Sequence, residues 1–242
     1  MKLWGRFLLL LMLCGCNSVP HVPADFISVP VQYGRYTIMT YQRLLDRTSP
    51  VHIYIEGDGY AFDAAGRPTN NPTPKGSFVR DLAARDTSPN VVYMARPCQY
   101  VMSPACTPDD WTMGRFSPDI IESMAAAVRG ISNSRPVVLI GYSGGAMISG
   151  LIINHYPDIP VTKWITIAGV LRHADWTAYF DDKPLSSSLD MIALPNVNQL
   201  HYIAAGDTVV PNKLSKKWIK SDDIVVVHGA KHSYFPSLIL DL

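Results

Sequence analysis

A serine flanked by glycines stands near the middle of the chain, in the pentapeptide Gly141-Tyr142-Ser143-Gly144-Gly145. The pattern Gly-x-Ser-x-Gly is typical of a sharp turn that lifts a serine hydroxyl above the edge of a sheet, with glycines where a Cβ would clash. Such a serine can attack a carbonyl carbon, because the helix that follows it points free N–H groups at the reacting oxygen. An ordinary glycine-rich turn between a strand and a helix is the alternative, since small residues also match this pattern by chance.

An aspartate and a histidine follow this serine, each just beyond a later apolar segment. Asp207 comes after residues 201–205, and His232 comes after residues 224–227. A serine hydroxyl is a poor nucleophile until a base removes its proton, so we expect His232 to be the base and Asp207 to fix its tautomer. His228 is the rival base, but it lies closer to the preceding apolar segment, where histidines are more often packed than catalytic. The alternative for Asp207 is a solvated turn carboxylate.

Short β-branched segments alternate with helical patterns along most of the chain. We expect strands at residues 29–41 (one or two antiparallel edge strands), 51–55, 91–94, 137–140, 161–168, 201–205 and 224–227. We expect helices at residues 78–85, 119–131, 213–220 and 233–240, and one more that begins after Ser143. This alternation predicts an α/β protein with a mostly parallel central sheet and helices on both faces. Because loops after parallel strands open at one edge of the sheet, Ser143, Asp207 and His232 can meet there.

The chain order Ser143, Asp207, His232, with each residue on a loop after a successive late strand, resembles the α/β-hydrolase superfamily. The resemblance covers residues 26–242 and implies a single α/β-hydrolase domain in which these three residues form a catalytic triad. It also implies an oxyanion hole of two backbone N–H groups, one from Gly144 and one, by motif position, from Asp58.

The loop that would hold the second oxyanion donor departs from the usual pattern. Lipases and esterases often carry His-Gly-Gly there, whereas this chain has Glu56-Gly57-Asp58-Gly59. The glycines still permit a close approach of the backbone. A carboxylate beside an oxyanion would repel it, so we expect the Asp58 side chain to point away or to bind a cation. A solvated turn residue is the alternative interpretation of Asp58.

Several stretches are similar to a poorly characterised group of bacterial exported α/β-hydrolase-like lipoproteins, namely residues 95–100, 115–118, 171–176 and 184–189, with Cys106 and Trp111. Residues 171–194 also stand where the superfamily inserts lids, but this segment is too short for a large lipase lid. We therefore expect a short or minimal lid and a small or medium acyl substrate. Three aromatic side chains of the segment could line the pocket, although core packing is the preferred interpretation: Trp176, Tyr179 and Phe180.

The two later cysteines, Cys98 and Cys106, are expected to form a disulfide in an exported protein. On the chain-entropy model, closing so short a loop stabilises the folded state by about 2.5 kcal/mol. Two cysteines without paired histidines nearby make a poor ligand set, so a metal site is not expected. No other cofactor is expected either.

The first sixteen residues are typical of an export signal. Lys2 and Arg6 precede a leucine-rich run at residues 7–13, which is too short to span a bilayer. The run leads to Gly15-Cys16 and resembles a bacterial lipobox, which implies that Cys16 carries acyl chains such as palmitate and becomes the new N-terminus. A conventional cleaved signal with incidental cysteines is the alternative.

Residues 17–25 contain two prolines and no apolar periodicity, which is typical of a flexible tether. The residue after the lipidated cysteine is Asn17, which by resemblance to enterobacterial sorting favours the outer membrane. We therefore expect a protein of the bacterial cell envelope, anchored through lipid on Cys16 and facing the periplasm.

Length and composition narrow the functional classes. With 242 residues, 48% of them apolar, the chain can bury one sizeable core. The formal net charge is +1 and no basic run stands out, so nucleic acid is not expected as a partner. We expect a serine hydrolase that cleaves a carboxylic ester through an acyl-enzyme intermediate. Amide, peptide or thioester cleavage would use the same residues, and a non-catalytic envelope lipoprotein that uses the fold as a binding module is the alternative class.

Overall fold

The computed structural model describes residues 24–242. The predicted signal peptide at residues 1–16, the predicted lipidation of Cys16 and most of the predicted tether lie outside the described residues. Within the described part the strands form one eight-stranded sheet in the order β1-β2-β4-β3-β5-β6-β7-β8. Their bounds are β1 Ile27–Tyr33, β2 Tyr36–Leu44, β3 Val51–Ile55, β4 Asn90–Met94, β5 Val137–Tyr142, β6 Val161–Ile167, β7 Asn198–Ala204 and β8 Ile224–Val227.

The sheet is antiparallel at one edge and parallel in the rest. β2 pairs antiparallel with both β1 and β4, whereas every pair from β4 through β8 is parallel. Every residue of β3, β4 and β5 is buried, because helices cover both faces of the central sheet. This explains why these strands read as continuous apolar runs and not as alternating ones. The predicted mostly parallel sheet with antiparallel edge strands is confirmed.

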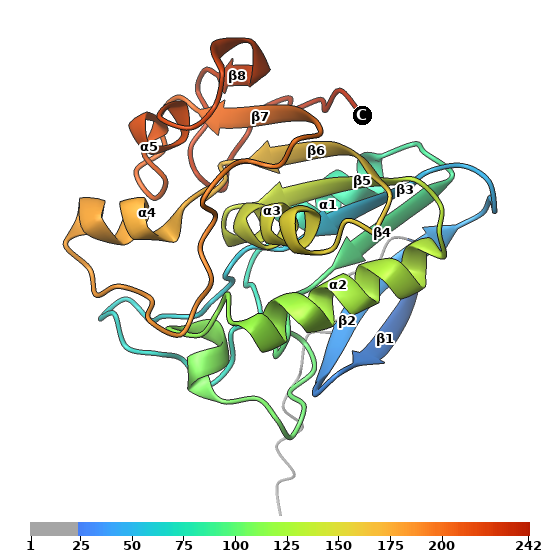
Figure 1. Cartoon of the computed structure of the whole chain (residues 1–242), viewed down its shortest axis with the longest axis horizontal. Coiled ribbons are helices and arrows are strands. Elements are labelled where there is room, and N and C mark those ends of the chain that lie inside the picture. The colour runs from blue at the N-terminus through green and yellow to red at the C-terminus, as the bar shows by residue number, and fades with distance from the viewer. Residues whose placement is uncertain (1–23) are drawn as a thin grey trace, which may run out of the picture.

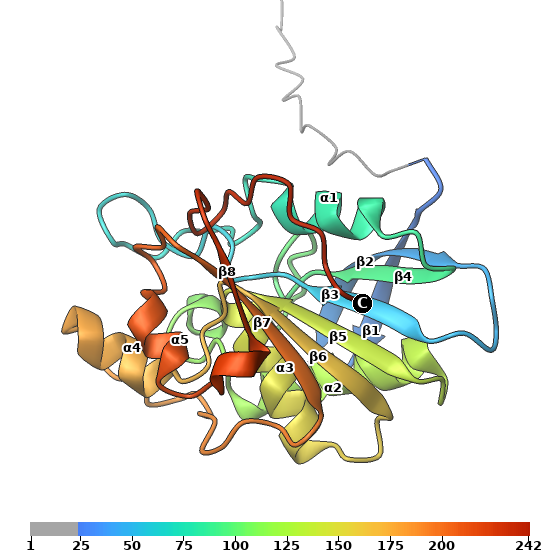
Figure 2. The same cartoon turned by 90° about the horizontal axis from the view of Figure 1, so that it is seen from above.

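The helices lie on both faces of the sheet and beyond its carboxyl edge. Their bounds are α1 Phe78–Arg85, α2 Pro118–Ser132, α3 Gly144–His155, α4 His173–Phe180 and α5 Asn212–Lys216, with short 3-10 turns at Pro108–Trp111 and Ser221–Asp223. α1 packs on β3 and β4, while α2 and α3 cover the opposite face, as the two views of the ribbon show (Figure 1, Figure 2). α4 and α5 lie where the parallel strands end (Figure 1).

Two buried apolar clusters hold these layers together, one on each face of the sheet. The cluster beneath α2 and α3 includes Met124, Met147 and Trp164, and the cluster beneath α1 includes Tyr54, Leu82 and Ile165.

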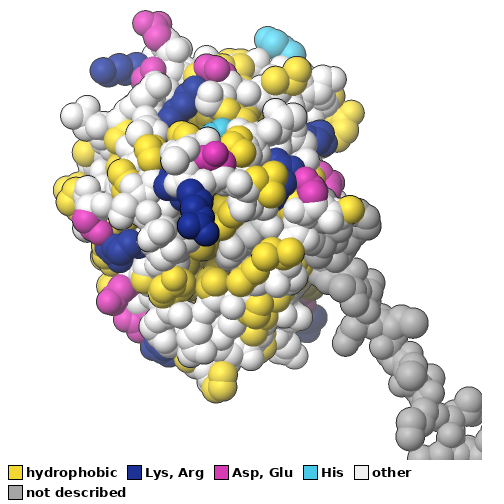
Figure 3. All heavy atoms as spheres, turned by 90° about the vertical axis from the view of Figure 1, so that its right-hand side faces the viewer, with side chains coloured by type: hydrophobic (Ala, Val, Ile, Leu, Met, Phe, Trp, Pro, Cys, Tyr) yellow, Lys and Arg dark blue, Asp and Glu magenta, His cyan; other side chains and the backbone are white. Residues whose placement is uncertain are grey.

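The face at the amino ends of the parallel strands, opposite α4 and α5, carries basic and acidic side chains scattered between hydrophobic ones (Figure 3). Among the described residues, no helix is long and apolar enough to cross a bilayer.

The predicted helix at residues 233–240 is wrong, because this segment has no regular helix. Pro236 lacks the N–H that a helical hydrogen bond requires, and Ser237 has a positive φ of 57°. Instead, Phe235 is buried against Phe78, and Leu238 packs on the apolar cluster beneath α1. The apolar spacing that suggested a helix is therefore used by an irregular chain that covers the sheet. The predicted helix at 213–220 is also shorter, since α5 ends at Lys216.

The loop after β4 is closed by a disulfide between Cys98 and Cys106. Gln99, the residue after Cys98, contacts the loop after β3. Its Nε2 donates a hydrogen bond to the carbonyl oxygen of Gly57 at 3.0 Å. Oε1 of the same amide accepts from the backbone N–H of Arg96 at 3.0 Å. The crosslinked loop is thus attached directly to the segment that follows β3.

Candidate active site

Ser143 occupies the sharp turn between β5 and α3. Its backbone has φ 51° and ψ −120°, a conformation that costs free energy for a residue with a Cβ. The neighbouring chains leave no room for side chains beside it. A Cβ on Gly141 would lie 2.5 Å from the carbonyl oxygen of Gly145, and one on Gly145 would lie 2.4 Å from that of Ile55. The backbone angles of Ser143 and the lack of space beside Gly141 and Gly145 agree with the turn that the sequence predicts.

The loops after β7 and β8 bring Asp207 and His232 to this serine. His232 Nε2 lies 3.0 Å from Ser143 Oγ, and His232 Nδ1 lies 3.0 Å from Asp207 Oδ2. The other carboxylate oxygen of Asp207 accepts the backbone N–H groups of Val209 and Val210 at 2.9 and 2.8 Å. Because an ionised carboxylate accepts but cannot donate, Nδ1 carries the proton toward Asp207, and Nε2 is left to accept from the serine hydroxyl.

His228, the rival histidine, is exposed at the end of β8 and takes no part in this hydrogen-bonded chain. The ring of His232 instead packs beside Tyr142, with ring centroids 5.2 Å apart. Tyr142 itself packs edge-on against Phe78. These contacts restrict the orientation of the imidazole, as its hydrogen bond to Asp207 does.

Two backbone N–H groups beside Ser143 are not engaged by hydrogen bonds among the described residues, namely those of Asp58 and Gly144. The N–H of Gly57 is not available, because it donates to Glu56 Oε1 at 2.9 Å. The peptide between Gly57 and Asp58 has its carbonyl bonded to Gln99, and in a trans peptide the N–H points the opposite way. Gln99 therefore fixes the direction of the Asp58 N–H.

The Asp58 carboxylate binds two arginines from the crosslinked loop. It forms an ion pair with NH1 of Arg96 and a second one with Nε of Arg115 at 3.3 Å. Burial opposes ionisation of Asp58, but the charges of Arg115 and Arg96 outweigh it, so the pKa of this carboxyl is lowered. The expectation that the side chain would meet a cation thus agrees with the geometry. The alternative of a solvated turn residue does not.

Arg96, Arg115 and Gln99 are the site residues to which the sequence assigned no role. The two arginines were visible within the stretches that resemble the lipoprotein group. The one feature of the sequence that could have pointed to these arginines is Asp58, because a carboxylate beside the expected oxyanion hole calls for a positively charged neighbour. Nothing in the spacing of residues 58, 96 and 115 indicates that they meet.

Glu56 is a buried carboxyl directly before this loop. Burial raises the pKa of Glu56 to about 7, although hydrogen bonds from the Gly57 N–H and the Tyr93 hydroxyl favour its ionised form. It holds the first peptide of the loop through the Gly57 N–H.

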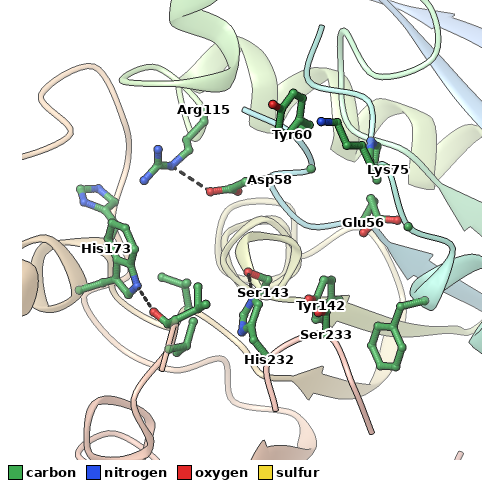
Figure 4. Close-up of a pocket in the computed structure, with 18 of the residues that line it drawn as sticks. Glu56, Asp58, Tyr60, Lys75, Arg115, Tyr142, Ser143, His173, His232 and Ser233 are labelled. Carbon is green, nitrogen blue, oxygen red and sulfur yellow. Dashed lines mark hydrogen bonds and ion pairs between the residues drawn. The ribbon is translucent and has the colours of Figure 1, made fainter. Parts of the chain in front are cut away.

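Ser143 lies in a pocket of about 350 Å³. Its walls come from the loops after β3, β4, β7 and β8 and from α4. Figure 4 labels wall residues from all of these except the loop after β7. Trp176 lines this pocket and also packs against the core cluster beneath α2 and α3. Tyr179 and Phe180 are 42% and 39% exposed, so the preference for core packing is wrong for these two. The segment at 171–194 contains one helix of eight residues, α4, and no large lid. Within residues 24–242, His, Cys, Asp and Glu side chains form no cluster suited to a metal ion.

Comparison with known proteins gives matches to solved structures alone, since no family model and no curated protein matches the chain. An α/β serine hydrolase without a lid from Xanthomonas campestris has a TM-score of 0.54 and 15% identity, with 88% of each chain covered. An α/β serine hydrolase homologue from Coxiella burnetii has a TM-score of 0.56 and 16% identity over 86% of this chain and 89% of its own. Est1E from Butyrivibrio proteoclasticus has a TM-score of 0.59 and 11% identity over 86% and 90%.

These likenesses confirm the predicted fold: the chain has the α/β-hydrolase fold with a minimal lid. Because the sequence identities are only 11–16%, these structural matches support the fold alone. The chemistry of the site has to be argued from the side chains that this chain itself brings together.

Proposed function

We propose that this protein is a serine hydrolase that cleaves a carboxylic ester through an acyl-enzyme intermediate. The observation that carries the proposal is the continuous chain from Ser143 Oγ through His232 to Asp207, with 3.0 Å at each hydrogen bond, inside a pocket. A buried serine, histidine and aspartate could each have a structural role, but their joint alignment at a strained turn is typical of nucleophilic catalysis.

In the first half of the reaction, Ser143 Oγ attacks the ester carbonyl carbon while His232 Nε2 takes the hydroxyl proton. Asp207 stabilises the imidazolium that forms and keeps its ring in place. The carbonyl oxygen becomes an oxyanion and accepts hydrogen bonds from the N–H groups of Gly144 and Asp58. The intermediate then collapses, and His232 gives its proton to the leaving alcohol oxygen.

In the second half, a water molecule takes the place of the alcohol. His232 removes a proton from this water as the water oxygen attacks the acyl carbon. When the intermediate collapses, the bond to Ser143 Oγ breaks, His232 returns the proton to Oγ, and the acid is released. The same steps would serve an amide, peptide or thioester, because these reactions differ from ester cleavage mainly in the leaving group. A non-catalytic binding role is the competing class, and the intact alignment of Ser143, His232 and Asp207 argues against it.

Labelling with a fluorophosphonate probe tests the proposal without knowledge of the substrate. The wild-type protein should be labelled on Ser143, since the probe reacts with an activated serine hydroxyl. The control is Ser143→Ala, which should not be labelled. Absence of labelling in folded wild-type protein would favour the binding-module alternative.

We also propose that the protein is held at the cell envelope through acyl chains on Cys16, most simply in the outer membrane facing the periplasm. The motivation is the apolar run that leads to Gly15-Cys16. Several acyl chains hold a protein stably at a membrane, whereas one chain binds marginally. In membrane fractionation, wild-type protein should be found with membranes, and Cys16→Ser should be released or left unprocessed. Wild-type protein that is entirely in the soluble fraction would contradict this prediction.

A further inference from the structure

We propose that one arm of the pocket, which we call the Arg115 arm, binds a carboxylate, so that the substrate is an ester that carries a carboxylate group close to the scissile bond. The Arg115 arm consists of Arg115 and the lining residues next to it. Phe116 and Trp176 lie against the Arg115 guanidinium, and the His173 ring stacks on Phe116. Val170, Val209 and Val210 line the pocket beside Trp176. This inference rests on the proposed function and names the class of ester that the site would take.

Ser143 and His232 stand between two different sides of the pocket (Figure 4). The Arg115 guanidinium and the His173 ring lie near each other on one side, and Tyr60, Lys75 and Glu56 lie on the other (Figure 4). The Lys75 ammonium is engaged there, since its Nζ lies 3.3 Å from the centroid of the Tyr60 ring. The two parts of an ester bound across Ser143 would therefore meet different surroundings.

The Arg115 arm has a surplus of positive charge. Asp58 is the carboxylate in ion-pair contact with both Arg96 and Arg115, so one negative charge faces two guanidinium groups. Arg96 is enclosed, because one terminal nitrogen meets Asp58 and the other donates to the carbonyl oxygen of Arg115. The remaining positive charge is thus available at Arg115, on the pocket wall.

The His173 ring of the Arg115 arm makes no hydrogen bond among the described residues. Within residues 24–242, both ring nitrogens of His173 are buried and form no hydrogen bond, and the His173 side chain is only 8% exposed. Nε of Arg115, whose side chain is 7% exposed, faces Asp58 in the 3.3 Å ion pair. Buried donors are almost always paired in folded proteins, so a buried group left without a partner indicates an absent ligand. Burial lowers the pKa of His173, although the Asp190 carboxylate, 3.9 Å from Nδ1, opposes this shift. A neutral imidazole ring can donate one hydrogen bond.

A carboxylate fits these surroundings better than a neutral or dianionic group. Its single negative charge balances the single surplus positive charge, and its two oxygens match the planar fork of a guanidinium. The remaining walls of the arm are apolar side chains such as Val170 and Val210, which exclude water and strengthen the ionic contact. A cationic substrate group would instead be repelled by Arg115.

Two matched pairs of esters test the inference, each comparing a carboxylate with its amide. Monoethyl glutarate and ethyl glutaramate place the group on the acyl side, while acetylglycolate and its amide place it on the alcohol side. Wild-type protein should prefer the acid of at least one pair by roughly 10- to 100-fold in kcat/KM, the range of a charge-assisted hydrogen bond. This preference should fall as the salt concentration rises.

Arg115→Gln should reduce the acid-to-amide ratio by a similar roughly 10- to 100-fold factor, while Arg115→Lys should keep part of the preference. The ratio within one variant does not depend on how much of the protein is folded. The matched control is Lys213→Gln, which removes a positive charge outside the pocket lining, where Lys213 lies over the Tyr179 ring, and it should leave the ratio unchanged. Equal rates for acid and amide in wild-type protein, or an unchanged ratio in Arg115→Gln, would overturn the inference.

Failure of the proposed function would look different, since no ester would be cleaved and Ser143 would not react with fluorophosphonate. For that case, calorimetric binding of the same acids and amides to Ser143→Ala measures the Arg115 arm without turnover. Tighter binding of an acid would support the arm even then, whereas equal binding would reject it.

Discussion

Ser143→Ala is expected to lower kcat for ester cleavage by on the order of 10⁶-fold, and His232→Ala by a similar factor. The double variant should fall no further. Ser143 and His232 act as one unit, because loss of the hydroxyl leaves the base nothing to deprotonate, and loss of the base leaves the hydroxyl inert. The residual rate would come from the oxyanion donors and from substrate binding. Single-turnover kinetics with a chromogenic ester would measure all three variants.

Asp207→Asn should reduce kcat on the order of 10⁴-fold, less than the loss of Ser143. An asparagine at this position can present its NH₂ group to Nδ1, which favours the wrong tautomer of His232. The control is His228→Ala, which should keep most of the activity, since His228 is exposed and takes no part in the hydrogen-bonded chain. An inactive but folded His228→Ala together with an active His232→Ala would reverse the assignment of the base. Full activity in Ser143→Ala would reject the whole mechanism.

The positions of these residues could be read from the sequence because each of them follows a strand. Ser143, Asp207 and His232 lie in the connections that follow apolar strands, and parallel strands carry all such connections to the same edge. The turn at Ser143 was equally readable, since the need for glycines on both sides is local. Local pattern and sheet topology thus suffice to predict that Ser143, His232 and Asp207 meet at one edge of the sheet.

The ion pairs of Asp58 with Arg96 and Arg115 could not be predicted from sequence patterns. Asp58 lies in the loop after β3, whereas Arg96 and Arg115 lie near the two ends of the long loop after β4. These three side chains meet only because the crosslinked loop folds back toward the loop after β3. The periodicity of the sequence does not predict the path of such an irregular loop. The error at 233–240 has a related cause. Phe235 and Leu238 have helical spacing, but Pro236 and the positive φ of Ser237 break the helix, and burial of Phe235 holds the chain in place.

Arg96→Met is expected to cost about 3 kcal/mol of unfolding free energy and to lower kcat/KM by about 10²- to 10³-fold. The Arg96 side chain is 4% exposed and lies between Asp58, the carbonyl oxygen of Arg115 and the Phe116 ring. Methionine has a similar length and keeps the packing, but it leaves the Asp58 carboxylate with one cation where it had two. The released carboxylate would lie close to the oxyanion, because an added Cβ on Gly144 would be 2.0 Å from Asp58 Oδ1.

A thermodynamic cycle separates the ion pair from simple packing. Asp58→Asn keeps the backbone N–H that we assign to the oxyanion and removes the charge. The double variant Asp58→Asn with Arg96→Met should therefore lose less free energy than the two single variants added together, since neither partner is left buried alone. Arg35→Met is the matched surface control: Arg35 pairs with Asp119 at 2.9 Å, but both side chains are about half exposed, so its loss should change stability far less. Urea unfolding would give the four free energies. Strict additivity in the cycle, with normal kcat/KM in Arg96→Met, would mean that Arg96 only fills space and that the Asp58 charge does not affect the oxyanion.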